Sequence, residues 1–281
     1  MEESVYQQRG YLRESWRLFH LRDELAGEVD SHYHEFFKLV FFRSGRVTYS
    51  VEGRHSDLQP DDVVLVPMGS VHRVEADPAV RYERVILYLS PAFLRQYSTA
   101  DCDLAHGFRL CREKSRYVLR PQAEDAARLR RTLRALEQNL TGGEYGAERM
   151  ADALLVQLLI ELGRQAEQPR DALVPARVLN PKAVELLRYI DEHLAEDISI
   201  DALAERFFIS KYHMMRSFRA ETGFTIHGYI TDKRLLLARG MMQSGKSAAD
   251  ACFDCGYRDY SAFSRAFKKK FGVSPRSGRE L

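Results

Sequence analysis

The chain has 281 residues, long enough for two domains, and 45% of them are apolar, which excludes a disordered or fibrous protein. No apolar run approaches the ~20 residues of a membrane helix, the first residues lack a signal-peptide pattern, and four cysteines are too few for a disulfide framework. A cytoplasmic protein without a membrane partner is therefore expected. The net charge is +2, and residues 181–281 are mildly basic, with 17 Lys and Arg against 13 Asp and Glu.

The region from about residue 32 to residue 90 has the pattern of short strands. Stretches rich in branched and aromatic residues alternate with turns that contain glycine or proline, such as Ser44-Gly45 and Glu52-Gly53. The expected strands cover residues 36–42, 47–51, 63–66 and 84–89. Strands at this spacing predict an all-β sandwich or barrel.

The hydrophobic period then changes to that of helices. Leucines recur at helical spacing in two segments, on either side of the loop Thr141-Gly142-Gly143; the positions are Leu129, Leu133, Leu136, Leu140, Met150, Leu154, Leu158 and Leu162. An antiparallel helical hairpin is expected. Its second helix is apolar on more than one face, which favours a homodimer contact, although both helices burying against their own domain is the alternative.

A polar, proline-containing segment separates two predicted domains. We expect an effector-binding and dimerisation domain over residues 1–166, a linker over residues 167–180 and a DNA-binding domain over residues 181–281. Asn180-Pro181 supplies an N-cap and a first-turn proline for the opening helix of that domain, and its core stripe is Val184, Leu187, Ile190 and Leu194.

Two segments of the last hundred residues match at an offset of 49 residues. The residues Met214, Arg216, Phe218 and Gly223 correspond to Phe263, Arg265, Phe267 and Gly272, and the N-cap residue Ser210 corresponds to Asp259. A short capped helix precedes each segment, starting after Ser199 and Ser247. Each pair forms a helix-turn-helix unit, and a helix over residues 225–243, about 28 Å long at 1.5 Å per residue, joins the two.

Burial of the apolar pairs determines which face each second helix presents outward. The first presents Tyr212, Met215, Arg216 and Arg219, and the second presents Ser261, Ser264, Arg265 and Lys268. Arginine pairs with guanine in the major groove, whereas the run Lys268, Lys269 and Lys270 suits phosphates. Consecutive major-groove faces lie about 34 Å apart, so one chain spans two of them on double-stranded DNA.

This region resembles the AraC/XylS family of bacterial transcription regulators. The resemblance rests on Ser210-Lys211-Tyr212-His213-Met214, Gly256-Tyr257, Phe263-Ser264-Arg265-Ala266-Phe267-Lys268 and Gly272-Val273-Ser274-Pro275, within residues 182–277. It implies that Tyr212, Met215, Arg216, Tyr260, Ser261, Ser264 and Arg265 face the bases. The two-domain layout adds the expectation that an effector controls contact with paired half-sites or with RNA polymerase as a partner. Met215 stands where a polar base-reading residue is common in the family.

The N-terminal half is similar, less strongly, to the cupin-type sensor domain of the same family. The two motifs are His32-x-His34 with Gly45, and Pro67-x-Gly69-x-x-His72. Metal-binding cupins carry a glutamate where this chain has Lys38. Strand alternation predicts that His32, His34, Phe36 and Lys38 share one face, in the interior of a cupin-type β-barrel.

Three histidines can hold a divalent metal, but an ammonium beside them repels a cation, so no metal and no cofactor is expected. The favoured reading is an organic effector bound by His32, His34, Lys38 and His72, with a sugar or sugar-derived metabolite as one candidate and packed histidines as the alternative. Cys252-x-x-Cys255 lies in a helix without a partner pair, which favours a core position over zinc or redox chemistry.

The sequence thus predicts a two-domain α+β protein that is not an enzyme. We expect a sequence-specific transcription regulator, an activator controlled by a small-molecule effector. Two other hypotheses stay open: a metal-dependent cupin enzyme fused to a DNA-binding domain, and a DNA-bending architectural protein.

Overall fold

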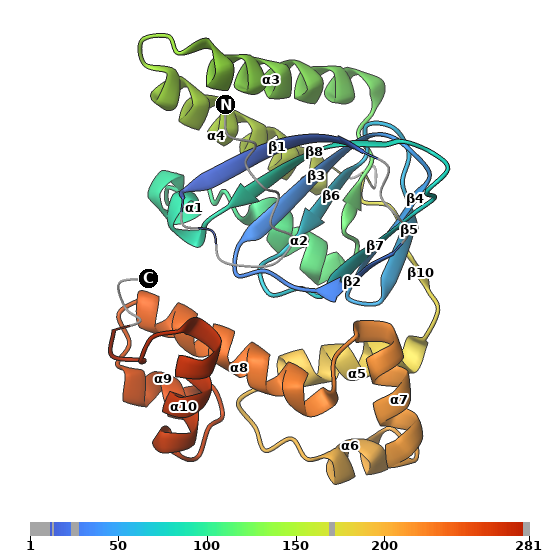
Figure 1. Ribbon diagram of the computed structural model, residues 1–281, viewed down its shortest axis with the longest axis vertical. Helices are drawn as coiled ribbons and strands as arrows, with labels where there is room; N and C mark the ends of the chain where they lie inside the picture. The colour runs from blue at the N-terminus through green and yellow to red at the C-terminus, as the bar shows by residue number, and fades with distance from the viewer. Residues whose placement is uncertain (1–11, 13, 24–27, 169–171, 278–281) are drawn as a thin grey trace. The chain divides into compact units, whose positions relative to one another are not determined.

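The computed structural model describes residue 12 and residues 14–23, 28–168 and 172–277. These residues form two compact units, one up to Arg177 and the other from Val178 onward. The first contains the strands and the green helices of Figure 1, and the second contains the helices drawn from yellow to red.

The first unit is built on two sheets, each with five strands among the described residues. In hydrogen-bonded order, the first sheet contains β1 (Trp16–Asp23), β8 (Tyr82–Leu89), β3 (Phe37–Ser44), β6 (Val63–Val66) and β9 (Val118–Leu119). The second contains β10 (Arg177–Val178), β5 (Arg54–Asp57), β4 (Val47–Val51), β7 (His72–Ala76) and β2 (Glu28–His32). The predicted β-rich domain is confirmed. The described pairings give two antiparallel sheets, and their closure into one barrel stays a prediction.

Burial on both faces explains why the strands β3, β6 and β8 of the first sheet were recognisable from sequence, whereas β1 and β9 of the same sheet were not predicted. Lys38 of β3 faces the second sheet, where its Nζ lies 3.4 Å from Nε2 of His72. The neighbouring Phe37 faces the other way, and its ring centroid lies 4.9 Å from that of Phe108 in α2 (His106–Lys114). A strand covered on both faces becomes almost continuously apolar. The polar strands β5 and β7 lack that signature and were not predicted.

The helical hairpin is confirmed, with a shifted loop. It consists of α3 (Ala123–Gly142) and α4 (Ala147–Glu167), so Thr141 and Gly142 belong to the first helix and not to the loop. Gly143, with φ +61°, ends α3 in the left-handed conformation that glycine tolerates. Leu140 and Met150 are exposed near this end of the hairpin. The helical spacing of apolar residues therefore continues beyond the part of the hairpin that is buried.

Part of the segment between α4 and the second unit is attached to strands. The predicted linker includes residues 169–171, which lie outside the described residues. Beyond them, Leu173 is buried and bridges Leu119, and the Val174 amide donates to the Val118 carbonyl at 2.8 Å. Residues 172–174 thus pair along β9, and the domain boundaries themselves stay a prediction.

The second unit is helical and contains both predicted helix-turn-helix units. Its helices are α5 (Pro181–Glu192), α6 (Ile200–Arg206), α7 (Lys211–Thr222), α8 (Ile226–Gln243), α9 (Ala248–Asp254) and α10 (Tyr260–Phe271). Helix α8 joins the pair α6–α7 to the pair α9–α10 (Figure 1). None of the helices in the described part of the chain combines the length and the apolar character that crossing a bilayer requires.

Local capping explains why these helix starts were predictable. The side chains of Asn180, Ser199, Ser210, Ser247 and Asp259 each accept a backbone N–H of the first turn that follows. One expectation was wrong: α5 ends at Glu192, so Leu194 lies outside its core stripe and is half-buried. Its carbonyl instead accepts a hydrogen bond from Nε of Arg234 at 2.8 Å, which ties the chain after α5 to α8.

Candidate DNA-binding surface and effector pocket

The first recognition helix, α7, is oriented by its apolar pair. Met214 and Phe218 are buried, which leaves the opposite face of the helix to solvent. On that face Tyr212 is 71% exposed and Met215 is 44% exposed. Arg216 and Arg219 are exposed beside them. The structure therefore gathers the four residues proposed for the first half of the DNA surface on one side of α7.

The second recognition helix, α10, has the same design with a smaller outward face. Phe263 and Phe267 are fully buried, whereas Ser261, Arg265 and Lys268 are exposed. Ser264 is half-buried on this side. Tyr260 is also half-buried, and its ring centroid lies 5.8 Å from that of Phe263, so part of this side chain supports the core.

Ion pairing separates the cations of these helices into two groups. Arg216, Arg265, Lys268 and Lys269 form no ion pair with a described residue. In contrast, Nζ of Lys270 lies 2.9 Å from a carboxylate oxygen of Asp232 in α8, and its side chain is only 15% exposed. The expectation that Lys270 is placed for phosphate is therefore wrong, because its ammonium joins α10 to α8.

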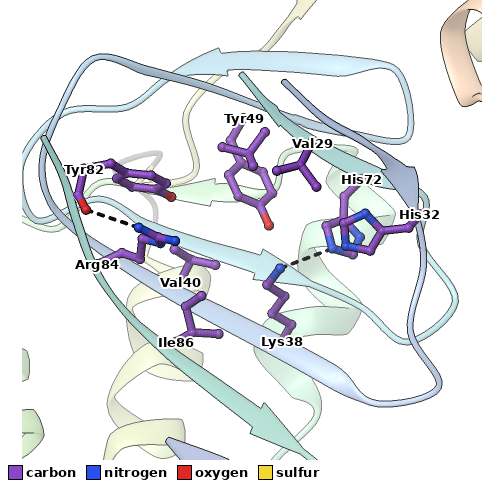
Figure 2. A pocket seen from close by; sticks show the side chains of 10 residues that line it. Val29, His32, Lys38, Val40, Tyr49, His72, Tyr82, Arg84 and Ile86 are labelled. Carbon is purple, nitrogen blue, oxygen red and sulfur yellow. Dashed lines mark hydrogen bonds between the residues drawn. The ribbon is translucent and has the colours of Figure 1, made fainter. Parts of the chain in front are cut away.

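A pocket opens between the facing sides of the two sheets (Figure 2). The enclosed cavity is small, about 20 Å³ for the centres of water-sized molecules, and its mouth opens to solvent. The described residues that line it are His32, Lys38, His72, Arg84, Tyr49, Tyr82, Val29, Val40, Val74 and Ile86. Three of the four residues proposed for the effector thus line one cavity.

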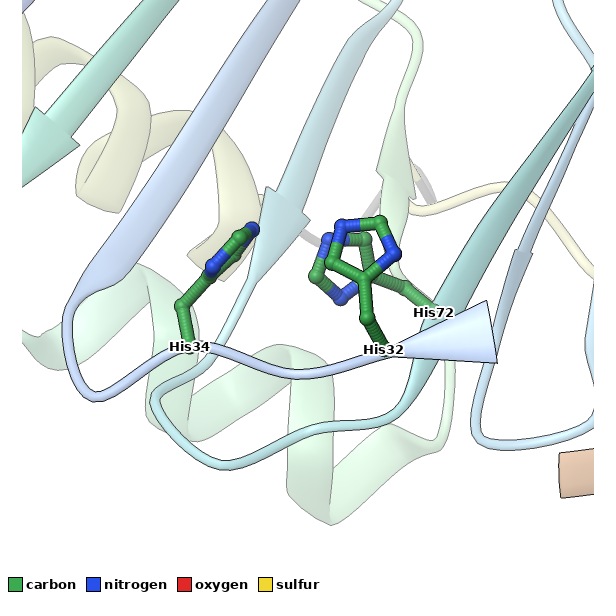
Figure 3. A group of neighbouring side chains, drawn as sticks. All are labelled: His32, His34 and His72. Carbon is green, nitrogen blue, oxygen red and sulfur yellow. The ribbon is translucent and has the colours of Figure 1, made fainter. Parts of the chain in front are cut away.

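The fourth proposed residue, His34, lies beside the other histidines. Nitrogen atoms of His32, His34 and His72 all lie within 4.8 Å of one another, and the three rings point into the same space (Figure 3). Strand alternation predicted that His32, His34, Phe36 and Lys38 follow one strand; this is wrong, because β2 ends at His32 and β3 begins at Phe37. His34 lies on the connecting segment, and His72 opens β7 in the second sheet.

The hydrogen bonds at His72 define its neutral form. Its Nδ1 donates to the carbonyl of Ser70 at 3.0 Å, and its Nε2 accepts from Nζ of Lys38 at 3.4 Å. Burial, followed by the charge of Lys38, lowers the pKa of both His72 and His34 well below the usual histidine value. Both imidazoles are therefore neutral at pH 7 beside a buried lysine.

The histidine cluster does not fit a resident metal ion. The three imidazoles lie close enough to converge on one cation, which zinc would require at about 2.0–2.1 Å from each nitrogen. The Nζ of Lys38, however, already donates to the Nε2 of His72 that a metal would need. A second positive charge at this place is repelled, and lysine cannot replace a carboxylate ligand.

Sequence reasoning missed Arg84, Tyr49 and Tyr82 as pocket residues. Arg84 is 3% exposed, and its two terminal nitrogens pair with the two carboxylate oxygens of Asp23. Its guanidinium also lies 4.1 Å from the ring centroid of Tyr82. A signal existed, because an arginine within the apolar strand 84–89 implies a charge facing a buried space.

Two family models match the chain. The AraC-like ligand binding domain matches residues 22–162, and a helix-turn-helix domain matches residues 203–280. These are the same two regions that the histidine cluster and the tandem helices occupy. The match to the first model extends over half of the chain.

Two relatives and one solved structure are similar to parts of the chain. The HTH-type transcriptional activator RhaS of Escherichia fergusonii is 26% identical over 261 residues, 90% of this chain and 88% of the relative. The protein of the same name from Citrobacter koseri is 32% identical over 130 residues, 46% of this chain and 45% of the relative. The C-terminal domain of AraT, a response regulator from Geobacillus stearothermophilus, is 27% identical, with a TM-score of 0.36, over 37% of this chain and 88% of that structure.

Proposed function

Because the chain belongs to the AraC family of transcription regulators, we propose that it activates transcription by placing α7 and α10 in two adjacent major grooves of a promoter. A small molecule in the pocket between the sheets controls this binding. Membership of a regulator family replaces the hypothesis of a metal-dependent cupin enzyme. Activation is the role that the RhaS relatives carry in their names.

The single observation that carries the proposal is the pair of exposed cationic faces at the two ends of α8. In the proposed complex nine side chains contact DNA, namely Tyr212, Met215, Arg216, Arg219, Tyr260, Ser261, Ser264, Arg265 and Lys268. Arg216 and Arg265 read guanine, Tyr212 and Met215 pack on thymine methyl groups, and Lys268 pairs with phosphate. The 18 residues of α8 span about 27 Å, which suits two faces of DNA one helical turn apart.

Selection of random double-stranded DNA by the purified full chain tests this proposal. We expect enrichment of a bipartite sequence whose two elements lie about one helical turn, 10–10.5 base pairs, apart. The shared guanine contacts predict a G·C pair in each element. An architectural DNA-bending protein would instead enrich no defined sequence, and that result would contradict the proposal.

We further propose a homodimer formed through the helical hairpin. Met150 is exposed on α4, and Leu154, one turn later on the same side of the helix, is only partly buried in the unit's own core. A second hairpin would cover this apolar surface, and a two-fold dimer would place two DNA-binding units on paired sites.

Replacing Met150 and Leu154 together by Asp should convert the dimer to a monomer, because two carboxylates would be desolvated in the interface. Light scattering after gel filtration measures the mass of the full chain and of the variant. The matched control is Phe253→Asp, which alters an exposed aromatic residue on α9 and should leave the mass unchanged. A monomeric wild-type chain, or a double variant that remains dimeric, would exclude this interface.

Effector binding then acts by shifting the equilibrium between two arrangements of the chain. A ligand that binds one arrangement of the chain more tightly than another stabilises the arrangement that engages paired sites or RNA polymerase. We assign effector contacts to His32, Lys38 and His72, which line the pocket, and to His34, which has a ring nitrogen within 4.8 Å of those of His32 and His72.

A further inference from the structure

The pocket has an unusual charge for a buried space. Lys38 is 4% exposed and Arg84 is 3% exposed, and both side chains reach the cavity from neighbouring strands of the first sheet, as Figure 2 shows. None of the described residues that line the pocket is an aspartate or a glutamate. Asp23, which pairs with Arg84, is not among the lining residues, and its side chain is 47% exposed. The cavity wall therefore presents cations and no anions.

His34 supplies a second, independent observation. Its side chain is 97% buried, and among the described residues neither of its ring nitrogens has a hydrogen-bond partner. Its ring points toward His32 and His72, with centroids 4.9 Å from each (Figure 3). Since a neutral imidazole carries one N–H, His34 has a donor that is removed from water and directed into the cluster. Buried donors of this kind are normally paired, so the geometry indicates a missing acceptor.

We propose that the effector is a small organic acid whose carboxylate binds at Lys38 and His34. The carboxylate accepts one hydrogen bond from Nζ of Lys38 and another from the ring N–H of His34. The remainder of the molecule packs against Val40, Val74 and Ile86, which form the apolar wall of the same pocket. This inference rests on the proposed effector pocket and adds the chemical class of its ligand.

The position of Lys38 also explains why a metal is not needed to hold this anion. Its ammonium donates to one of the three clustered imidazoles and thus supplies, within the chain itself, the positive charge that a metal ion would bring. A charge-assisted hydrogen bond to a carboxylate is stronger than one between neutral groups, and it is strengthened further where the side chains are buried, as Lys38 and His34 are. The ligand's anionic group is therefore recognised by side chains alone.

Titration of the full chain with matched acids and neutral twins tests the proposal. Acetate against acetamide probes the carboxylate position alone, and the histidine ring signals in NMR spectra report binding. Glucuronate against glucose and benzoate against benzamide then distinguish a sugar acid from a non-sugar acid, measured by calorimetry. We expect acetate, and at least one larger acid, to bind while the neutral twins do not.

The variant Lys38→Met should lower the affinity for the acid by about tenfold or more, because it removes a charged hydrogen bond and keeps the length of the side chain. Lys182→Met, on the exposed surface of α5, is the control and should bind like the wild type. Circular dichroism confirms that both variants fold. Equal binding of acids and neutral twins, failure of acetate to bind, or full affinity in Lys38→Met would overturn the proposal. If a neutral sugar bound and no acid did, the acid class of the ligand would be overturned, and the proposal of an effector-controlled regulator would stand.

Zinc alone provides a second test of the same arrangement. After dialysis against Zn²⁺, we expect the wild-type chain to retain no stoichiometric metal and Lys38→Glu to retain one ion, since a carboxylate would then join three imidazoles. Stoichiometric zinc in the wild type would show that Lys38 does not occupy the position of the cation, and would overturn the proposal.

Discussion

Replacing Gly256 by alanine is expected to destabilise the second DNA-binding unit by about 2–5 kcal/mol. Gly256 has φ +96°, and a Cβ at this position would lie 2.5 Å from the carbonyl oxygen of Leu194 and 2.9 Å from Nε of Arg234. Neither atom is free to move. The Leu194 carbonyl already accepts a hydrogen bond from Nε of Arg234, and Nη2 of the same arginine donates to the Glu196 carbonyl at 2.6 Å. Backbone strain and a collision with fixed atoms therefore add together.

Amide hydrogen exchange in increasing urea, followed in peptides from α8, α9 and α10, measures this effect within the full chain. Gly240→Ala is the matched control, because a Cβ there meets no atom within 4 Å and the residue lies inside α8. The control should stabilise the helix by up to about 1 kcal/mol. If both alanines changed the protection of these helices equally, the close packing around Gly256 would not be the cause.

The second large effect is expected on DNA binding. Arg216→Ala and Arg265→Ala should each weaken binding to the selected sequence by about 1–3 kcal/mol and relax selectivity at one base pair. Both side chains are exposed, and neither forms an ion pair with a described residue, so their removal leaves no buried partner. Competition assays with single-base variants of the selected site measure the loss at each position.

Two lysines of the same helix provide contrasting controls for these arginines. Lys268→Ala should weaken binding to all sequences about equally and reduce the salt slope by about one. Lys270→Ala should lower the stability of the second unit, because it breaks the contact with Asp232, and should leave the salt slope unchanged. Equal losses on selected and random DNA for the arginine variants would show that these side chains contact only the backbone of the DNA.

The tandem helix-turn-helix units could be predicted from sequence because their determinants are local. An N-cap such as Ser210, an apolar pair such as Met214 and Phe218, and a closing glycine such as Gly223 all lie within fifteen residues. In a helix, spacing along the chain fixes position on the surface, so burial of the pair also determines which face is exposed. Family resemblance then connected that surface with DNA.

The sequence by itself thus determined the two regions, the cap and core of each recognition helix, and the presence of three histidines and a lysine in the N-terminal half. Only the tertiary structure decided what those four residues form. His34 lies between strands and His72 comes from the second sheet. The two residues are 38 positions apart in the sequence, and only the packing of the sheets brings them together. Sheet packing also placed Arg84 in the pocket, and helix packing in the second unit placed Lys270 against Asp232. Such contacts depend on elements distant in sequence, and no spacing along the chain encodes them.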